Sequence, residues 1–223
     1  MPHSSDVRIL ALGDSYTIGE GVAESERWPV RLTAMMRAAG TSVAEPIIIA
    51  RTGWTTDELS AGIDENLPTG AFDLVTLLIG VNNQYRGRSL DEYRQQFRAL
   101  LARAVAFAGS RASAVIVVST PNWGQTPFAR ESGRDVDAIA GEIDAFNAVA
   151  RDEAARAGAE FVDITPTSRR GGAEPEMIAA DGLHPSAVMY ELWARLILPV
   201  AIEAVGRRQP AVDGEEPVQA ARR

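Results

Sequence analysis

One serine in the sequence has the surroundings that nucleophilic catalysis would need. Ser15 lies in the stretch GDSY (residues 13–16), at the end of an apolar run. A serine acts as a nucleophile when a base lies within hydrogen-bond reach and a third group orients that base. The chain has no cysteine and two histidines, His3 in a short polar start and His184, so a histidine base must be His184. Asp181 lies three residues before it, close enough for a carboxylate to fix the ring tautomer.

Acyl transfer also needs hydrogen-bond donors directed at the oxyanion that develops on the substrate. Gly53 follows a second apolar run, and Asn82 follows a third run within Gly80–Asn83. The backbone N–H groups of Ser15 and Gly53 and the side-chain amide of Asn82 could supply these donors. A glycine at position 53 would let a substrate oxygen approach the N–H, because no Cβ blocks it.

Each of these fragments also has a simpler interpretation. Asp14-Ser15 alone is typical of a turn or a helix N-cap, and Asn82-Asn83 alone is typical of a turn. The glycines around Ser15 could suggest a phosphate-binding loop, but GDSYTIGEG matches neither G-x-x-x-x-G-K-[ST] nor G-x-G-x-x-G. The order of the fragments, each after an apolar run, favours a catalytic site over a non-catalytic binding module.

The elements that must position these residues are strands alternating with helices. Continuous apolar runs of strand length, typical of strands buried on both faces, lie at 7–13, 46–50, 73–80, 113–120 and 159–164. Helical patterns lie at 27–40, 55–67, 89–108, 134–158 and 186–206, and Pro199 should kink or end the last of them. This alternation predicts a parallel sheet with helices on both faces and a site at the carboxyl ends of the strands.

Composition excludes several classes of protein. The formal net charge is −8, which disfavours binding to nucleic acid or to anionic membranes. The absence of cysteine excludes disulfides and cysteine-based metal sites, and two histidines are too few for a multi-histidine metal site. No apolar stretch reaches the length of a membrane span, and the start lacks a secretory signal. We therefore expect a cytoplasmic protein with one domain over residues 1–206 and a disordered tail over 207–223.

The four motifs together resemble the SGNH hydrolases, also called GDSL-type esterases. GDSY, the glycine after the second run, G-x-N after the third run and D-x-x-H near the end occur in the order of that family, over residues 7 to about 200. The segments RTGWTTDEL, PNWGQTPFA and DGLHPSAVMY are similar to its lysophospholipase-type branch. The resemblance implies a three-layer α/β/α sandwich with a flavodoxin-like five-stranded parallel sheet. It also implies Ser15 as nucleophile, Asp181 and His184 as its partners, Ser15, Gly53 and Asn82 as the oxyanion hole, and no cofactor or metal.

One position departs from the family's pattern. The third motif of the family usually reads G-x-N-D, and here Asn83 takes the place of the aspartate. The usual aspartate braces the loop, and an amide can still donate and accept hydrogen bonds. We therefore expect activity to survive the change, with the oxyanion role at Asn82.

Aromatic residues near the motifs suggest the kind of substrate. Trp54, Tyr85, Trp123 and Phe128 could line an apolar acyl pocket, although loop packing would explain each one equally well. Trp28 and Trp193 lie in helical patterns and are expected in the core. The sequence thus predicts a serine esterase for small or medium acyl esters or lysophospholipid-like esters. A thioesterase or a sugar O-deacetylase would use the same triad, and the oligomeric state is not indicated.

Overall fold

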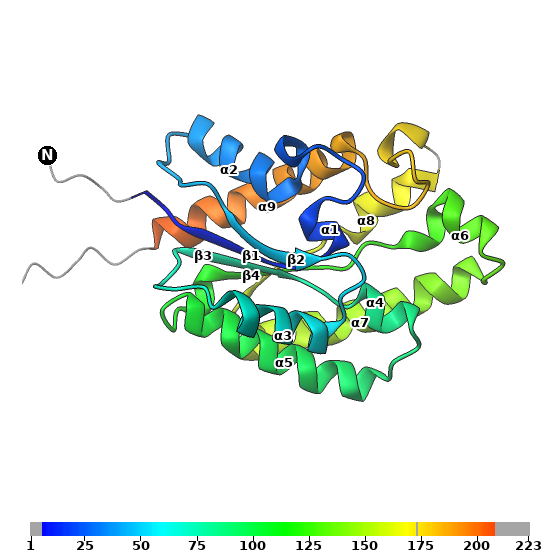
Figure 1. Cartoon of the computed structure of the whole chain (residues 1–223), viewed down its shortest axis with the longest axis horizontal. Helices are drawn as coiled ribbons and strands as arrows, with labels where there is room; N and C mark the ends of the chain where they lie inside the picture. Colours follow the sequence, from blue (N-terminus) through cyan, green and yellow to red (C-terminus); the bar gives the residue numbers. More distant parts are fainter. Residues whose placement is uncertain (1–5, 173, 208–223) are drawn as a thin grey trace, which may run out of the picture.

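The computed structural model describes residues 6–172 and 174–207, and its centre is a parallel five-stranded sheet (Figure 1). The strands follow the order β2-β1-β3-β4-β5, which is the flavodoxin-like order. Their bounds are Ile9–Asp14 (β1), Ile47–Arg51 (β2), Leu74–Leu78 (β3), Val115–Val118 (β4) and Glu160–Val162 (β5). The predicted fold class and the five predicted strands are confirmed.

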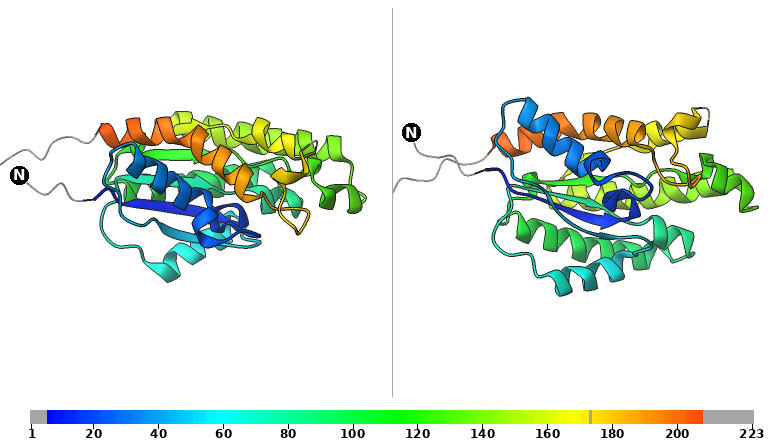
Figure 2. Two further views of the ribbon diagram at one scale, coloured as in Figure 1. Left: turned by 90° about the horizontal axis from the view of Figure 1, so that it is seen from above. Right: turned by 45° about the horizontal axis from the view of Figure 1, so that its top comes forward.

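Helices cover both faces of the sheet and make the outer two layers. Helices α2 (Trp28–Ala38) and α9 (Ala187–Gly206) lie side by side on one face (Figure 2). Helices α3 (Thr56–Asn66), α5 (Leu90–Phe107) and α7 (Val136–Ala157) cover the other face (Figure 1). Short helices lie near the carboxyl ends of the strands: α1 (Ser15–Ile18), α4 (Val81–Tyr85), α6 (Pro127–Glu131) and α8 (Thr165–Ser168).

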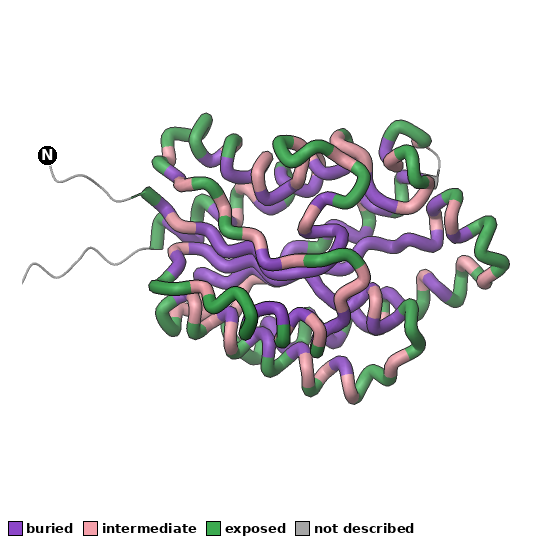
Figure 3. Tube along the Cα trace, in the orientation of Figure 1, coloured by how far each residue is buried: buried purple, intermediate pink, exposed green. Residues whose placement is uncertain are grey.

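The apolar strands explain why the sheet is buried (Figure 3). Every residue of β1 and β3 is buried, and successive side chains of a strand point to opposite faces. Ile9 and Leu74 accordingly belong to the core under α2 and α9, whereas Leu10 and Val75 belong to the core under α3 and α5. Two apolar cores therefore hold the sheet in place between its two layers of helices.

Two predictions about helices have clear outcomes. Trp28 and Trp193 are fully buried, as expected. Of the two effects expected of Pro199, a kink or an end of the last helix, the end is wrong, because α9 continues through this residue to Gly206. Proline within a helix costs about 3 kcal/mol, and burial of Ala201, Ala204 and Val205 beyond it offsets this cost. Of the tail expected from residue 207, only Arg207 is among the described residues.

Candidate active site

Ser15 is the first residue of α1 and directly follows strand β1. The Asp14 carboxyl group caps this helix, since its Oδ1 accepts a hydrogen bond from the Tyr16 N–H at 3.0 Å. Gly13 allows the helix to fold closely onto the sheet, because a Cβ there would lie 2.1 Å from Thr17 Oγ1 and 2.6 Å from the Leu78 carbonyl oxygen. Backbone N–H groups in the first turn of a helix have no partner within it. The Ser15 N–H therefore suits a bound oxygen atom.

His184 and Asp181 form a close pair in the loop before α9. The His184 Nδ1 lies 2.6 Å from Asp181 Oδ2, and Asp181 Oδ1 accepts hydrogen bonds from the Leu183 and His184 N–H groups, each at 2.9 Å. Partial burial acts to raise the pKa of Asp181, but the hydrogen bonds from the Leu183 N–H and from His184 together hold it below its usual range. Asp181 thus stays ionised and orients the His184 ring, and it favours the tautomer that carries its proton on Nδ1.

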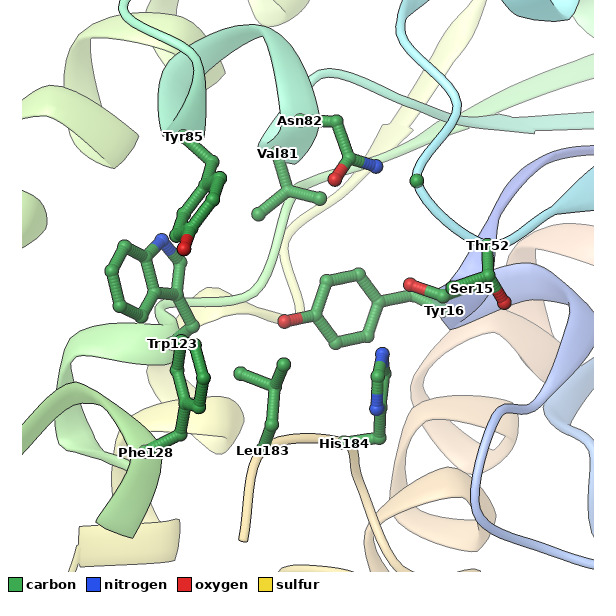
Figure 4. Close-up of a pocket in the computed structure, with 11 residues that line it drawn as sticks. Ser15, Tyr16, Thr52, Val81, Asn82, Tyr85, Trp123, Phe128, Leu183 and His184 are labelled. Carbon is green, nitrogen blue, oxygen red and sulfur yellow. The ribbon is translucent and has the colours of Figure 1, made fainter. Parts of the chain in front are cut away.

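Ser15 and His184 line one cavity together with Gly53 and Asn82. The two residues are nearly buried, with 5% of Ser15 and 8% of His184 exposed. Figure 4 shows the His184 ring with its outer nitrogen, Nε2, directed toward the Ser15 side of the cavity. Segments that lie far apart in the sequence therefore bring together all the residues predicted for the triad and the oxyanion hole.

Gly53 lies in the β2–α3 loop, and Asn82 is hydrogen-bonded to the backbone of that loop. Gly53 has φ +84°, a left-handed conformation that favours glycine, and its carbonyl oxygen accepts a hydrogen bond from Arg86 at 2.7 Å. Asn82 Nδ2 donates to the Trp54 carbonyl oxygen at 2.9 Å. An amide nitrogen carries two hydrogens, so the second hydrogen of Asn82 can serve an acceptor in the cavity.

Asn83 braces the same loop from beneath. Its Oδ1 accepts a hydrogen bond from the Thr56 N–H at 3.1 Å, and its Nδ2 donates to Thr56 Oγ1 at 2.7 Å. Asn83 is fully buried, whereas Asn82 lines the cavity. The two neighbouring asparagines therefore have the separate positions that the sequence suggested for them.

The far end of the cavity is apolar and aromatic. Tyr85, Trp123 and Phe128 line it as expected, with ring centroids 5.4 Å apart for Tyr85–Trp123 and 6.0 Å apart for Trp123–Phe128 (Figure 4). The Trp123 Nε1 donates to Gln84 Oε1 at 2.8 Å, so the indole presents carbon atoms to the cavity. The cavity has a volume of about 220 Å³, which suits a ligand of modest size.

The prediction that Trp54 lines this pocket is wrong. The indole packs against helix α3, where a Cβ on Gly62 would lie 2.1 Å from its outer ring carbon, and it joins the core under α3 and α5. Four lining residues were not predicted from the sequence: Tyr16, Thr52, Val81 and Leu183. Each directly neighbours a motif residue, which is the one sequence signal that could have identified it.

This arrangement is that of a serine hydrolase that acts on esters. The sheet brings the serine, the histidine–aspartate pair and the amide donors to its carboxyl edge, where ligands bind in parallel α/β folds. Within residues 6–172 and 174–207, no group of three or more His, Cys, Asp or Glu side chains is arranged to hold a metal ion, and no helix is long and apolar enough to cross a membrane.

Comparison with known families identifies the class more closely. The model of the GDSL-like lipase/acylhydrolase family matches residues 11–192. The chain belongs to this family. It is similar to a GDSL lipase of Mycobacterium tuberculosis, with 29% identity over 208 residues that cover 89% of this chain and 83% of the relative.

Solved structures share the fold at lower sequence identity. A lipase/acylhydrolase from Enterococcus faecalis superposes with a TM-score of 0.67 at 24% identity, covering 92% of this chain and 98% of its own. The acetylxylan esterase Axe2 from Geobacillus stearothermophilus superposes with a TM-score of 0.66 at 18% identity, covering 91% and 95%. These likenesses support the three-layer fold.

Proposed function

We propose that the protein hydrolyses carboxylic esters through an acyl-enzyme formed on Ser15. The observation that carries the proposal is the 2.6 Å contact between His184 Nδ1 and Asp181 Oδ2 in the loop that faces Ser15 across the cavity. A carboxylate in this position leaves Nε2 as the basic nitrogen and stabilises the imidazolium that forms when it takes a proton. A binding module would have no need for such a pair beside a serine.

In the acylation step, Ser15 acts as the nucleophile and His184 as the base. The Ser15 Oγ attacks the ester carbonyl carbon while His184 Nε2 takes the proton of the serine hydroxyl. The carbonyl oxygen becomes an oxyanion, which accepts hydrogen bonds from the Ser15 and Gly53 N–H groups and from Asn82 Nδ2. When the carbon–oxygen bond to the alcohol breaks, His184 returns the proton to the departing alkoxide, and the acyl group remains on Ser15.

The deacylation step repeats these roles with water. His184 Nε2 takes a proton from a water molecule as its oxygen attacks the acyl carbon, and the same donors stabilise the second oxyanion. The bond to Ser15 Oγ then breaks, and His184 gives the proton to that oxygen. The acid leaves and the serine hydroxyl is regenerated.

The apolar cavity supports small or medium acyl groups as the substrate class. Its far wall consists of Val81, Tyr85, Trp123, Phe128 and Leu183, none of which carries a charge that an alkyl chain would have to desolvate. Lysophospholipid-like esters, thioesters and O-acetylated sugars would use the same triad. The values of kcat/KM measured for these substrates rank them.

The decisive experiment replaces the nucleophile. Ser15→Ala should abolish hydrolysis of p-nitrophenyl acetate and labelling by a fluorophosphonate, with an unchanged circular dichroism spectrum. Ser42→Ala, at an exposed serine near the opposite end of the sheet, is the matched control and should retain full activity. Activity of Ser15→Ala within about tenfold of wild type would contradict the proposal, because loss of the nucleophile in such a triad costs several orders of magnitude.

A further inference from the structure

Tyr16 lies between the substrate cavity and a second, smaller cavity. Its side chain lines both of them, together with Trp123 and Leu183. Tyr16 is 3% exposed, and its ring packs against His184, at a centroid distance of 5.6 Å, and against Trp193, at 6.2 Å. Figure 4 shows this ring extending from α1 along the cavity between Val81 and Leu183. Tyr16 therefore forms a partition between the two spaces.

The second cavity continues into the core beneath α9. Beyond the partition it is lined mainly by buried residues: Pro121, Asn122, Thr126, Ser168, Ile178, Pro185, Met189 and Trp193. Its volume of about 10 Å³ is close to the space that one water molecule needs. Asn122 Nδ2 and Trp193 Nε1 are buried, and neither has a hydrogen-bond partner among the described residues. The space behind Tyr16 is thus a gap about the size of one water molecule, and only the Tyr16 ring separates it from the substrate cavity.

The hydroxyl group of Tyr16 points away from the Ser15 nucleophile. Figure 4 shows its hydroxyl on the side of Trp123, away from the Ser15 hydroxyl. Burial raises the pKa of Tyr16 far above its usual value, and the negative charges of Asp14 and Asp181 raise it further. The phenol therefore stays neutral. The part of the side chain that a substrate meets is the ring, which acts by its volume.

We propose that Tyr16 sets the length of the acyl group that the enzyme accepts, by closing the substrate cavity against the second cavity. This inference rests on the proposed ester hydrolysis. A hydrophobic pocket discriminates by about 10-fold or more for each methylene group that it admits or rejects. Replacement of the ring by a smaller apolar side chain joins the two cavities and allows longer chains to enter beneath α9.

The test compares Tyr16→Leu with wild type on p-nitrophenyl esters from acetate through butyrate and octanoate to decanoate. The measured quantity is the ratio of kcat/KM for decanoate to that for butyrate, because a general loss of rate from the altered packing of His184 cancels in it. We expect this ratio to rise at least about 10-fold in Tyr16→Leu. Tyr16→Phe keeps the ring and should keep the wild-type ratio. An unchanged ratio in a folded Tyr16→Leu that still reacts with fluorophosphonate would overturn the inference.

A second variant tests the path behind the ring. Met189 lines the second cavity but not the first, so Met189→Val alone should leave the ratio unchanged while Tyr16 closes the partition. In the Tyr16→Leu background the same change should raise the ratio further. A double variant with the same ratio as Tyr16→Leu alone would count against the proposed path. If Tyr16→Leu does not fold, Tyr16→Met takes its place, since methionine adapts to irregular space.

The two proposals fail in different ways. If wild type hydrolyses none of the esters, the proposed function is wrong, and the partition is then tested without turnover. Titration calorimetry with butyrate and decanoate measures whether Tyr16→Leu gains affinity for the longer acid. No gain in affinity would overturn the role of Tyr16 independently of catalysis.

Discussion

Asn83 makes both of its side-chain hydrogen bonds to a single residue, Thr56. The amide oxygen accepts from the Thr56 N–H and the amide nitrogen donates to the Thr56 hydroxyl. That hydroxyl in turn donates to Gln96 Oε1. The Thr56 hydrogen is therefore already used, and position 83 needs a donor as well as an acceptor. This pairing explains why an amide suits a position where the family usually has an aspartate.

Asn83→Asp is expected to destabilise the protein at neutral and higher pH. The new carboxylate would be fully buried, with one N–H to accept from and competition from Gln96 for the Thr56 hydroxyl. Burial raises the pKa of a carboxyl group, so the cost is present when it is ionised and disappears when it is protonated. We expect a loss of roughly 1–3 kcal/mol in the free energy of unfolding near pH 8, measured by urea denaturation. Equal stability of the two proteins at pH 8 would show that the network rearranges freely.

Asn82→Ala should lower kcat by about 10²–10³-fold while changing KM little. The amide hydrogen of Asn82 that is not bonded to Trp54 would stabilise charge that exists only in the transition state, so its loss affects the rate more than substrate binding. Asn82→Asp is a close steric match that cannot donate, and it should be impaired at least as strongly. Steady-state kinetics with p-nitrophenyl butyrate measure both effects. A main effect on KM would place Asn82 in ground-state binding instead.

Asp181→Asn is expected to reduce kcat by roughly 10³–10⁴-fold. The amide oxygen of the new side chain could still accept from the Leu183 N–H, but its amide nitrogen, facing His184 Nδ1, would donate to that atom and reverse the tautomer. Nε2 would then carry the proton and could not act as a base toward Ser15. The rate of fluorophosphonate labelling reports the same loss without turnover. Labelling at the wild-type rate would mean that Asp181 does not orient His184.

Much of the fold follows from the sequence because the strands are buried on both faces. Their continuous apolar runs predicted five strands, and the alternation with helices predicted their parallel arrangement. The parallel arrangement in turn explains why Ser15, Gly53 and Asn82 meet at one edge. The helical pattern over 186–206 also predicted the extent of α9, Ala187–Gly206, whereas the continuation of this helix through Pro199 depends on the burial of Ala201 and Ala204.

The lining of the cavity was less predictable than the residues that act on the ester. Trp54 and Tyr85 both follow motif residues, yet Trp54 packs against Gly62 whereas Tyr85 faces the cavity. The difference depends on the direction in which each loop leaves its strand, and residue spacing does not encode that direction. Tyr16 was missed for the same reason, because its position next to Ser15 does not reveal that its ring crosses the cavity.

Asp14 is a buried carboxyl group that the proposed mechanism does not use. Its Oδ1 caps helix α1, and its Oδ2 is buried with no hydrogen-bond partner among the described residues. Burial raises the pKa of Asp14 to about 7, although hydrogen bonds from the Tyr16 and Asp14 N–H groups act to lower it. The folded protein therefore holds this proton at pH values where an unfolded chain has already released it.

The pH dependence of stability tests this property of Asp14. A carboxyl group whose pKa is raised by folding favours the folded state below its unfolded pKa, about 3.8, and this contribution is lost as pH rises toward 7. An asparagine in its place could still cap the helix but could not ionise. We therefore expect the stability of Asp14→Asn relative to wild type to increase by roughly 1–4 kcal/mol from about pH 4 to about pH 8, measured by urea denaturation. Asp135→Asn, at the exposed N-cap of α7, is the matched control and should show a smaller change. A difference between Asp14→Asn and wild type that stays constant across this range would mean that folding does not raise the pKa of Asp14.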